Sequence, residues 1–444
     1  MARLNTAPPR PRTHEGASAK RLTGEQRLRR AVLACMLWER EFYEDGREIA
    51  DRILEEVRAV DPAVVRDLAI EARTAFKLRH VPLLLVSALV RVHRREAHAD
   101  TVLPHVIRRA DELGEFVAVH AWMNGVQPAE VKPVLGAQVK RGLAEAFRSF
   151  DRYQFAKYDR KNAAVRLRDV MRLVHPKPKD AHQSATWAML RDNNLLPPDT
   201  WESNLTAGAD KRETFERLLR GGKLGYLALL RNLRNMEQAG VDRALVQRAI
   251  LERKGADSVL PFRYVAAARA APQFEPQIDK ALRASLEGQD ALPGRTLVLV
   301  DHSASMDMAR VSARSDLTRF DAAATLASII PADDLRVFAF SQDVAEVPHR
   351  PGMAGIEAIA RSMRSGGTWL GRALQTVMAH PHDRLIVVTD EQSHDRVPDP
   401  VVERSYMVNV ASNRNGVGYG RWRHIDGFSE SIVRYIAEVE REGL

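Results

Sequence analysis

Apolar residues recur at steps of three and four positions through most of the first 290 residues of the chain. This spacing puts apolar side chains on one face of a helix and predicts amphipathic helices. We expect them at 27–37, 49–60, 62–73, 82–94, 103–113, 137–150 and 245–253. Short helices that follow one another without strands predict an all-α, HEAT-like repeat array, although no fixed sequence period is visible.

The apolar pattern changes after residue 295, where short continuous apolar runs alternate with amphipathic stretches. The runs predict buried strands at 296–301, 335–340, 385–390 and 406–410. The stretches between and after them predict helices at 321–330, 355–363, 370–379 and 429–440. Strands that alternate with helices are typical of βαβ units, in which helices cover both faces of a sheet. We therefore expect an α/β domain with a Rossmann-like parallel sheet.

These patterns divide the chain into three segments. Residues 1–24 are rich in Pro, Arg and small polar residues, and this composition predicts a flexible tail. Residues 25–290 form the expected helical-repeat domain, and residues 295–444 form the α/β domain. The sequence Leu292-Pro293-Gly294 marks the linker between them. A length of 444 residues is consistent with more than one hydrophobic core.

Composition changes this picture in one respect, the expected cellular compartment. No apolar run approaches 18 residues, and the first residues lack the pattern of a secretion signal. The single cysteine, Cys35, cannot form a disulfide within the chain and fits a reducing compartment. We therefore expect a cytoplasmic protein with no membrane partner.

Charge is distributed unevenly between the two domains. The chain has a net charge of +9, but residues 295–444 hold 17 arginines, no lysine and 20 acids, a net charge of −3. The preceding residues must therefore carry +12. A basic excess on one domain favours a polyanionic ligand, and its alternative explanation is a solvated, arginine-rich surface.

Oxygen-bearing side chains stand where two of the expected strands end. Asp301 ends one strand and is followed by Ser303 and Ser305, Thr368 lies in a Gly-Gly-Thr loop, and Asp390 ends another strand. The carboxyl ends of parallel strands meet at one edge of a sheet, where α/β folds bind ligands. Carboxylate and hydroxyl oxygens suit Mg²⁺ or another divalent cation. The sequence thus predicts a metal site, in which Asp390 binds directly or through a water molecule.

The order Asp301-x-Ser303-x-Ser305, Thr368, Asp390 resembles the metal-ion-dependent adhesion site (MIDAS) of von Willebrand factor A domains. The resemblance implies a cation that attracts a carboxylate from a protein partner.

The whole chain, from about residue 16, resembles the Ro autoantigen family, whose helical part is the TROVE module. The motifs are Leu173-Val-His175-Pro-Lys177-Pro178, Leu227-Ala-Leu-Leu-Arg231-Asn232-Leu233, the pair Lys157-Tyr158 with Arg160 and Lys161, and Ile425-Asp-Gly-Phe428. Matching Lys157 to the basic helix of the family leaves a one-residue gap before His175. Either Arg160 or Lys161 is therefore the counterpart of a second basic position.

The resemblance implies a ring of helical repeats, a monomeric ribonucleoprotein component that binds RNA. Single-stranded ends of misfolded RNA would enter the hole, small structured Y-type RNA would bind the rim, and an exoribonuclease is the analogous protein partner. The RNA-binding candidates are Lys157, Tyr158, Arg160, Lys161, Arg172 and His175. Cations interleaved with aromatic rings suit sequence-tolerant binding of single strands. The alternatives are a solvated helix face, a core position for Tyr158, and a helix end at His175 before Pro176.

The metal site leaves two classes of function open. In a phosphotransferase, a second acid would stand two residues after the nucleophilic Asp, whereas Ser303 stands there in this chain. This difference favours a non-catalytic scaffold that binds RNA and recruits an acidic protein. A Mg-dependent phosphohydrolase or nuclease acting on RNA stays open, because Asp307, Glu391 and Asp395 lie near the site in sequence.

Overall fold

The computed structural model describes residues 11–33, 46–132, 134–196, 198–257, 259, 261–287, 291–310, 317–411, 413, 415–427 and 431–442. The chain divides into two compact units. The helical unit comprises residues 46–209, and the mixed unit comprises the residues before and after it. Within the described ranges, no helix has both the length and the apolar character needed to cross a bilayer.

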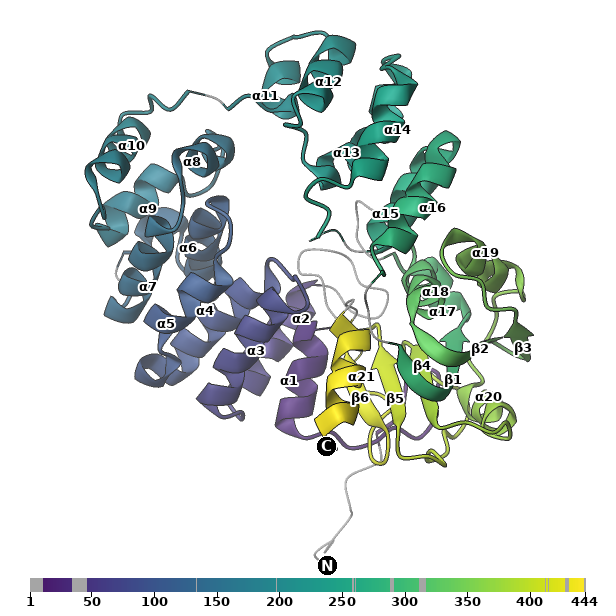
Figure 1. Ribbon diagram of the computed structural model, residues 1–444. Coiled ribbons are helices and arrows are strands. Elements are labelled where there is room, and N and C mark those ends of the chain that lie inside the picture. Colours follow the sequence, from purple (N-terminus) through teal and green to yellow (C-terminus); the bar gives the residue numbers. More distant parts are fainter. Residues whose placement is uncertain are drawn as a thin grey trace, which may run out of the picture. The chain divides into compact units, whose positions relative to one another are not determined.

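The helical unit is a stack of short helices joined by brief connections (Figure 1). Its elements are α2 (Gly46–Val57), α3 (Pro62–Thr74), α4 (Val81–His93), η1 (Arg94–Ala97), α5 (Ala99–Val106), α6 (Asp111–Met123), η2 (Pro128–Glu130), α7 (Ala137–Arg148), α8 (Arg152–Tyr158), α9 (Leu167–Val174), α10 (Ala181–Arg191) and α11 (Trp201–Thr206). Neighbouring helices pack in pairs, such as α3 on α4, α5 on α7, and α6 on α9. This arrangement confirms the all-helical prediction for these residues.

Local sequence explains how these helices begin and pack. Asp61 accepts a hydrogen bond from the backbone N–H of Ala63 and caps α3, whose first residue is Pro62. Residues 81–89 of α4 are all buried, so this helix forms the centre of the stack. A Cβ on Gly142 would lie 2.5 Å from the carbonyl oxygen of Ala99, so the close packing of α5 on α7 requires glycine.

One expected helix, at 103–113, is wrong, because the chain forms two helices there. Ile107 leaves the helical conformation and ends α5, and α6 starts at Asp111. The carboxylate of Glu112 accepts hydrogen bonds from the backbone N–H groups of Arg108 and Arg109 and also pairs with Arg73. This buried carboxylate therefore stabilises the turn between the two helices.

The mixed unit contains helices as well as the sheet. The helices before the sheet are α1 (Gly24–Leu33), α12 (Lys211–Arg220), α13 (Tyr226–Gln238), α14 (Arg243–Glu252), α15 (Pro261–Ala270), η3 (Pro272–Phe274) and α16 (Glu275–Ala284). Helix α15 packs on α18 (Arg319–Ile329), where Arg269 pairs with both carboxylate oxygens of Asp321. The compact units therefore do not follow the boundary that we expected near residue 290.

The sheet has six strands in the order β3-β2-β1-β4-β5-β6. They are β1 (Leu292–Asp301), β2 (Ala332–Phe340), β3 (Val344–Val347), β4 (Arg384–Thr389), β5 (Ser405–Asn409) and β6 (Arg423–Asp426). All neighbours are parallel except β2 and β3, which are antiparallel. The four expected strands are confirmed, but the sheet is mixed rather than purely parallel. The residues expected as a linker, 292–294, begin β1, whose pairing with β2 shifts register between Leu292 and Arg295.

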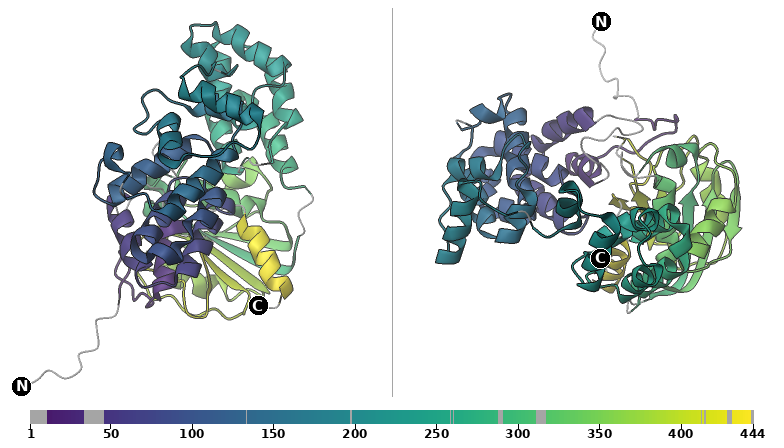
Figure 2. Two further views of the ribbon diagram at one scale, coloured as in Figure 1. Left: turned by 90° about the vertical axis from the view of Figure 1, so that its left-hand side faces the viewer. Right: turned by 90° about the horizontal axis from the view of Figure 1, so that it is seen from above.

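Helices cover both faces of this sheet. They are α17 (Ala304–Met308), α18, α19 (Met353–Arg361), α20 (Leu370–Val377) and α21 (Ser431–Glu442). Alternate residues of β1 point to opposite faces, and Leu297 and Leu299 join Leu374 of α20 in one apolar core. Helix α21, yellow in Figure 2, contacts β4 and β5 through Glu440, which bonds Arg384 and the Tyr406 hydroxyl. The chain leaves β1 toward β2 and returns on the other side at β4, so the carboxyl ends of β1 and β4 flank a topological switch point.

Candidate functional site

The five predicted metal ligands lie at the switch point between β1 and β4. Asp301 is the last residue of β1, and Asp390 follows the last residue of β4. The N–H of Ala304 donates to the carbonyl of Gly366 at 2.8 Å, which holds the loop of Thr368 beside the loop of Ser303 and Ser305. All five side chains are buried, at 8 % exposure or less. Parallel pairing and this loop contact thus bring the oxygen donors to one edge of the sheet.

Hydrogen bonds hold the first carboxylate of this site in place. Asp301 accepts a bond from the N–H of Ser303 at 2.8 Å and one from the hydroxyl of Thr389 at 2.5 Å. The hydroxyl oxygens of Ser303 and Ser305 are 3.1 Å apart. Burial, and then the negative charge of Asp390, raise the pKa of Asp301 to about 7. Two buried carboxylates therefore repel each other at this edge.

The donor set fits a divalent cation. Carboxylates and hydroxyls supply the hard oxygen ligands that Mg²⁺ prefers, and a double positive charge would offset the repulsion between Asp301 and Asp390. Within the described ranges, no three His, Cys, Asp or Glu side chains cluster in a metal-binding arrangement. A cation here would therefore depend on Ser303, Ser305 and Thr368 as well as on the carboxylates.

Residues 11–20, which we call the amino-terminal strap, pack beside this edge. They were expected to be part of a flexible tail, but Thr13, Ala17 and Ala19 are buried. The Thr13 hydroxyl and the Ala17 N–H both donate to the carbonyl of Ser393, in the loop after β4. The expectation is wrong for these residues, because the loops of the sheet supply partners for the strap's polar groups. Residues 1–10 of the expected tail lie outside the described residues, as does Cys35.

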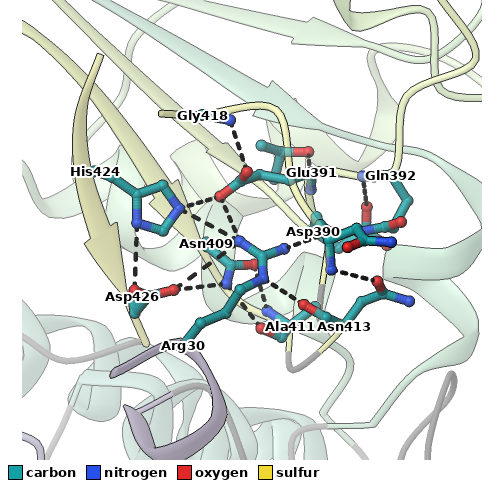
Figure 3. Close-up of polar contacts among 12 residues, drawn as sticks. Arg30, Asp390, Glu391, Gln392, Asn409, Ala411, Asn413, Gly418, His424 and Asp426 are labelled. Atoms are coloured by element: carbon teal, nitrogen blue, oxygen red, sulfur yellow. Dashed lines mark hydrogen bonds and ion pairs between the residues drawn. The ribbon is translucent and has the colours of Figure 1, made fainter. Parts of the chain in front are cut away.

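Arg30 of α1 inserts its guanidinium into a buried group of charges beside Asp390 (Figure 3). It pairs with Glu391 at 3.0 Å and lies 4.0 Å from Asp426, and it donates to the backbone carbonyls of Asn413 and Asn415. His424 of β6 bonds Glu391 through Nε2 and Asp426 through Nδ1, the latter at 3.3 Å. We call Arg30, Glu391, His424 and Asp426 the charge cluster.

The charge cluster is balanced when all four groups are ionised. Burial alone would lower the pKa of His424, but Asp426 and Glu391 raise it to about 9. Burial would raise the pKa of Glu391, but Arg30 and His424 hold it well below its usual range. Two cations thus face two anions without access to solvent. Glu391 has a left-handed backbone, φ 60°, so the cluster stabilises an unfavourable turn directly after Asp390.

The six RNA-binding candidates lie on α8, on α9 and in the loop between them, in the helical unit. Tyr158 and Arg160 line a cavity of about 260 Å³ together with Asp111 and Glu115 of α6. The guanidinium of Arg109 covers one face of the Tyr158 ring, 4.6 Å from its centroid. Lys161 and Arg172 are exposed, and Lys157 is half-buried with its ammonium over Tyr158. Arg109 and Lys157 therefore both lie over the Tyr158 ring, and a base that stacked on this ring would have to compete with them.

His175 lies apart from that cavity, in an open groove of about 570 Å³. The residue is exposed and ends α9 in a left-handed conformation, so it both terminates the helix and presents its ring to solvent. The groove is lined by Lys140, Arg141 and Arg148 of α7, by Lys177, and by the acids Asp100 and Glu145. The six candidates are therefore divided between at least two surfaces.

The basic residues of α7 were not among the candidates. Lys140, Arg141 and Arg148 lie 27 to 35 residues before His175, so only packing of α7 on α9 reveals their proximity. Their spacing along α7 could have predicted a shared basic surface, because residues seven or eight positions apart lie on one face of a helix. Arg141 pairs with Asp100 and Arg148 pairs with Glu145. In the described part of the chain, Lys140 and Lys177 form no ion pair.

Three comparisons with known proteins agree with this architecture. The family described as TROVE domain matches residues 191–319. A stretch of 106 residues, 22 % of this chain, is 30 % identical to Telomerase protein component 1 of Mus musculus, and it covers only 4 % of that protein's length. The crystal structure of the Deinococcus radiodurans RO (RSR) protein is similar over 95 % of this chain and 100 % of that chain, with a TM-score of 0.62 and 18 % identity.

These findings have different weight. At 18 % identity the structural similarity concerns the fold, a helix-rich region followed by a mixed sheet of the von Willebrand A kind. The two sequence matches bear on ancestry, and the family match spans helices α11 to α16 and the start of the sheet. Taken with the motifs quoted above, they support the resemblance of this chain to the Ro family of TROVE-domain proteins.

Proposed function

We propose that this protein is an RNA-binding component of a ribonucleoprotein, in which the helical region binds RNA and the metal site recruits a protein. The match of residues 191–319 to the TROVE domain family supports the RNA-binding part. The observation that carries the proposal is the groove of α7 and α9, where four cationic side chains and His175 face two acids. A basic groove attracts the phosphates of a nucleic acid, and the release of counterions drives binding.

The RNA would be single-stranded in part. Lys157, Arg160, Lys161 and Arg172 would contact phosphates, and Tyr158 and His175 would stack on bases or donate hydrogen bonds to them. Ends of misfolded or small non-coding RNA, and Y-type RNA on a separate surface, are the ligands that the family suggests. The four candidate cations of the protein are exposed or half-buried, so RNA can reach them without a rearrangement of the core.

The metal site would serve protein recruitment. Asp301, Ser303, Ser305 and Thr368 would hold a Mg²⁺ ion, with Asp390 bound directly or through water. Neutral hydroxyls leave such a cation only partly neutralised, so it would supply a binding position for a carboxylate from outside. An acidic surface of a protein partner, an exoribonuclease by family analogy, would fill that position.

We infer that the site binds rather than catalyses. Of the three acids that kept catalysis open, Glu391 is paired with Arg30 and His424. Asp307 is exposed on α17, two residues after Ser305. A general base must lie within hydrogen-bond reach of the group that it deprotonates. Asp395 is likewise engaged, because it accepts bonds from the N–H groups of Gly371 and Arg372.

One experiment separates the scaffold from an RNA-cleaving enzyme. The full chain is mixed with a 5′-labelled single-stranded 20-nucleotide RNA in MgCl₂ or in EDTA, and both mobility and length are read. The proposal expects retarded RNA of unchanged length, with equal affinity in both buffers. RNA that shortens only in MgCl₂, and not with an Asp301→Asn variant, would establish the nuclease. RNA that stays unbound would remove the RNA-binding proposal.

A further inference from the structure

Two large apolar side chains are exposed beside the candidate metal site. Trp369 directly follows Thr368 and is 41 % exposed, and Met308 lies three residues after Ser305 and is 65 % exposed. In the described part of residues 292–442, only Val401 and Tyr435 are also large, apolar and exposed. Half of this set therefore flanks the oxygen donors, which are themselves buried.

The two side chains belong to loops that are bonded to each other. Ser303 and Gly366 form a parallel bridge, and the Ala304 N–H donates to Gly366, so the segment that ends at Met308 starts beside the loop that leads to Trp369. Two contacts hold Trp369 in place. Its backbone N–H donates to the carbonyl of Ser341, and the centre of its ring lies 5.5 Å from that of the His394 ring. A Cβ on Gly367 would meet the rings of both Trp369 and His394. The indole is thus held at the edge of the site while much of its surface stays in contact with solvent.

We infer that Trp369 and Met308 form the apolar rim of a protein-docking surface, and that its partner presents a carboxylate next to a large apolar side chain. The inference rests on the proposed function of the metal site. To the carboxylate that the partner would present, it adds a neighbouring large apolar side chain. The carboxylate would complete the coordination of the cation, and the neighbouring apolar side chain would cover the indole of Trp369 and the thioether of Met308. Tryptophan and methionine are enriched in protein interfaces, and tryptophan is among the residues that contribute most of the binding energy.

Charge favours a protein over RNA as the occupant. Aromatic rings beside a cation could also accept the base and phosphate of a single strand. However, residues 295–444 carry a net charge of −3 and no lysine, in contrast to the +12 of the preceding residues. A negatively charged domain repels a polyanion at long range, whereas a single carboxylate on a largely apolar segment meets little repulsion. Three exposed arginines add local attraction for such a segment: Arg364 before the Thr368 loop, Arg372 in α20 and Arg396 in the loop after β4.

A peptide-display experiment tests this inference. A random peptide library is selected on the immobilised full chain in MgCl₂, and the bound members are eluted with EDTA. We expect the eluted sequences to combine Asp or Glu with an aromatic or large aliphatic residue within two positions. The best sequence, made as a labelled peptide, should bind Trp369→Ala and Met308→Ser at least tenfold more weakly. Tyr435→Ala and Val401→Ser are the matched controls and should bind it as the parent chain does.

The outcomes distinguish the rim from the metal site. Each variant is first checked for a rise in melting temperature on addition of MgCl₂, which reports a folded metal site. Acidic peptides without apolar preference that bind both rim variants as tightly as the parent would overturn the inference and leave the recruitment proposal intact. A library with no EDTA-elutable member would remove the recruitment proposal and the inference with it. Loss of single-stranded RNA binding in Trp369→Ala would assign the rim to RNA and overturn the inference.

Discussion

The sheet edge that carries the candidate metal ligands and the basic groove of the helical unit arrange their polar groups in opposite ways. The sheet edge buries Asp301, Asp390 and the three hydroxyls. The backbone N–H of Ser303 donates to Asp301, and the charge cluster begins at Glu391, directly after Asp390. In the groove, Lys140, Lys177 and His175 are half-buried or exposed. The polar groups of the sheet edge are therefore part of the folded core, whereas those of the groove are charges on its surface. Substitutions in the first should change stability and metal affinity, and substitutions in the second should change RNA affinity and its dependence on salt.

The largest expected effect is on stability, from Arg30→Met. Removing one partner of a buried ion group leaves uncompensated charges, a loss of about 3–5 kcal/mol in the free energy of unfolding. Chemical denaturation followed by fluorescence and circular dichroism measures it. Arg361→Met is the control, because Arg361 forms an exposed pair with Glu357 and should cost less than about 1 kcal/mol. Equal losses in the two variants would mean that the charge cluster contributes no more than a surface pair.

The second effect is a loss of stability at alkaline pH. The pKa of His424 is raised from 6.5 to about 9 in the folded protein, so its contribution is fully present below pH 6.5. The contribution is lost as pH rises through about 9, and it amounts to on the order of 3 kcal/mol. Unfolding measured between pH 6 and pH 10 should show this decline. A His424→Gln variant should be less stable at pH 6 and show a flatter profile, and a decline of the same size in that variant would assign it to another group.

Asp301→Asn should abolish most of the metal affinity, by about a hundredfold or more, because it removes the charged ligand. The amide oxygen still accepts from the Ser303 N–H, and the amide NH₂ can donate to the Thr389 hydroxyl in place of the bond that this hydroxyl gave to Asp301. Calorimetric titration with MgCl₂ measures the loss. Stability in EDTA should be unchanged or higher, since the repulsion from Asp390 disappears. Affinity for single-stranded RNA should stay within a factor of about two. If a folded Asp301→Asn chain lost RNA binding, the two sites could not act separately.

Lys140→Ala with Lys177→Ala should weaken RNA binding and flatten its salt dependence. Each lost phosphate contact on a single strand reduces the slope of log K against log salt by about 0.7, so the double variant should lose about 1.4. Anisotropy titrations at four salt concentrations give the slope. Lys211→Ala, at an exposed position of α12, is the control and should match the parent. An unchanged slope in the double variant would exclude the groove as a phosphate-binding surface.

The smallest effect is expected from His175→Ala. Loss of a neutral stacking or hydrogen-bonding group should reduce RNA affinity by about 1 kcal/mol and leave the salt slope unchanged. His182→Ala, on an exposed position of α10, is the matched control. The same titrations with a blunt duplex test which form of RNA His175 contacts. A loss as large for the duplex as for the single strand would place the single-strand site elsewhere.

Sequence patterns predicted the parts of the molecule that depend on local periodicity. The four strands with continuous apolar runs, and helices such as α3, α4 and α7, were located within a few residues. Strands β3 and β6 were missed because they are short and half-exposed, with burial patterns that no apolar run marks. The break between α5 and α6 was missed because its cause is the buried carboxylate of Glu112, which no spacing rule represents.

The gathering of the candidate metal ligands at one edge of the sheet was predictable because parallel strands carry their carboxyl-terminal residues to the same place. The charge cluster was not, because Arg30 has the sequence environment of an ordinary amphipathic helix and His424 that of a polar turn. Their proximity follows only from the docking of α1 against β6. In the same way, Lys140 joins His175 only through the packing of α7 on α9. The features that the sequence did not predict therefore depend mostly on contacts between segments that are distant along the chain.

The pairing of Arg30 with Glu391 has a consequence for how the protein is made. The two residues are 361 positions apart, so Arg30 is synthesised long before its partner exists. At about 5–20 residues per second, a ribosome would take roughly 20 to 70 seconds to bridge that interval. During this time α1 has no acidic pocket in which to bury its arginine. The mixed unit can therefore close only near the end of translation, and a nascent chain stalled before residue 391 would present α1 to chaperones or to other chains.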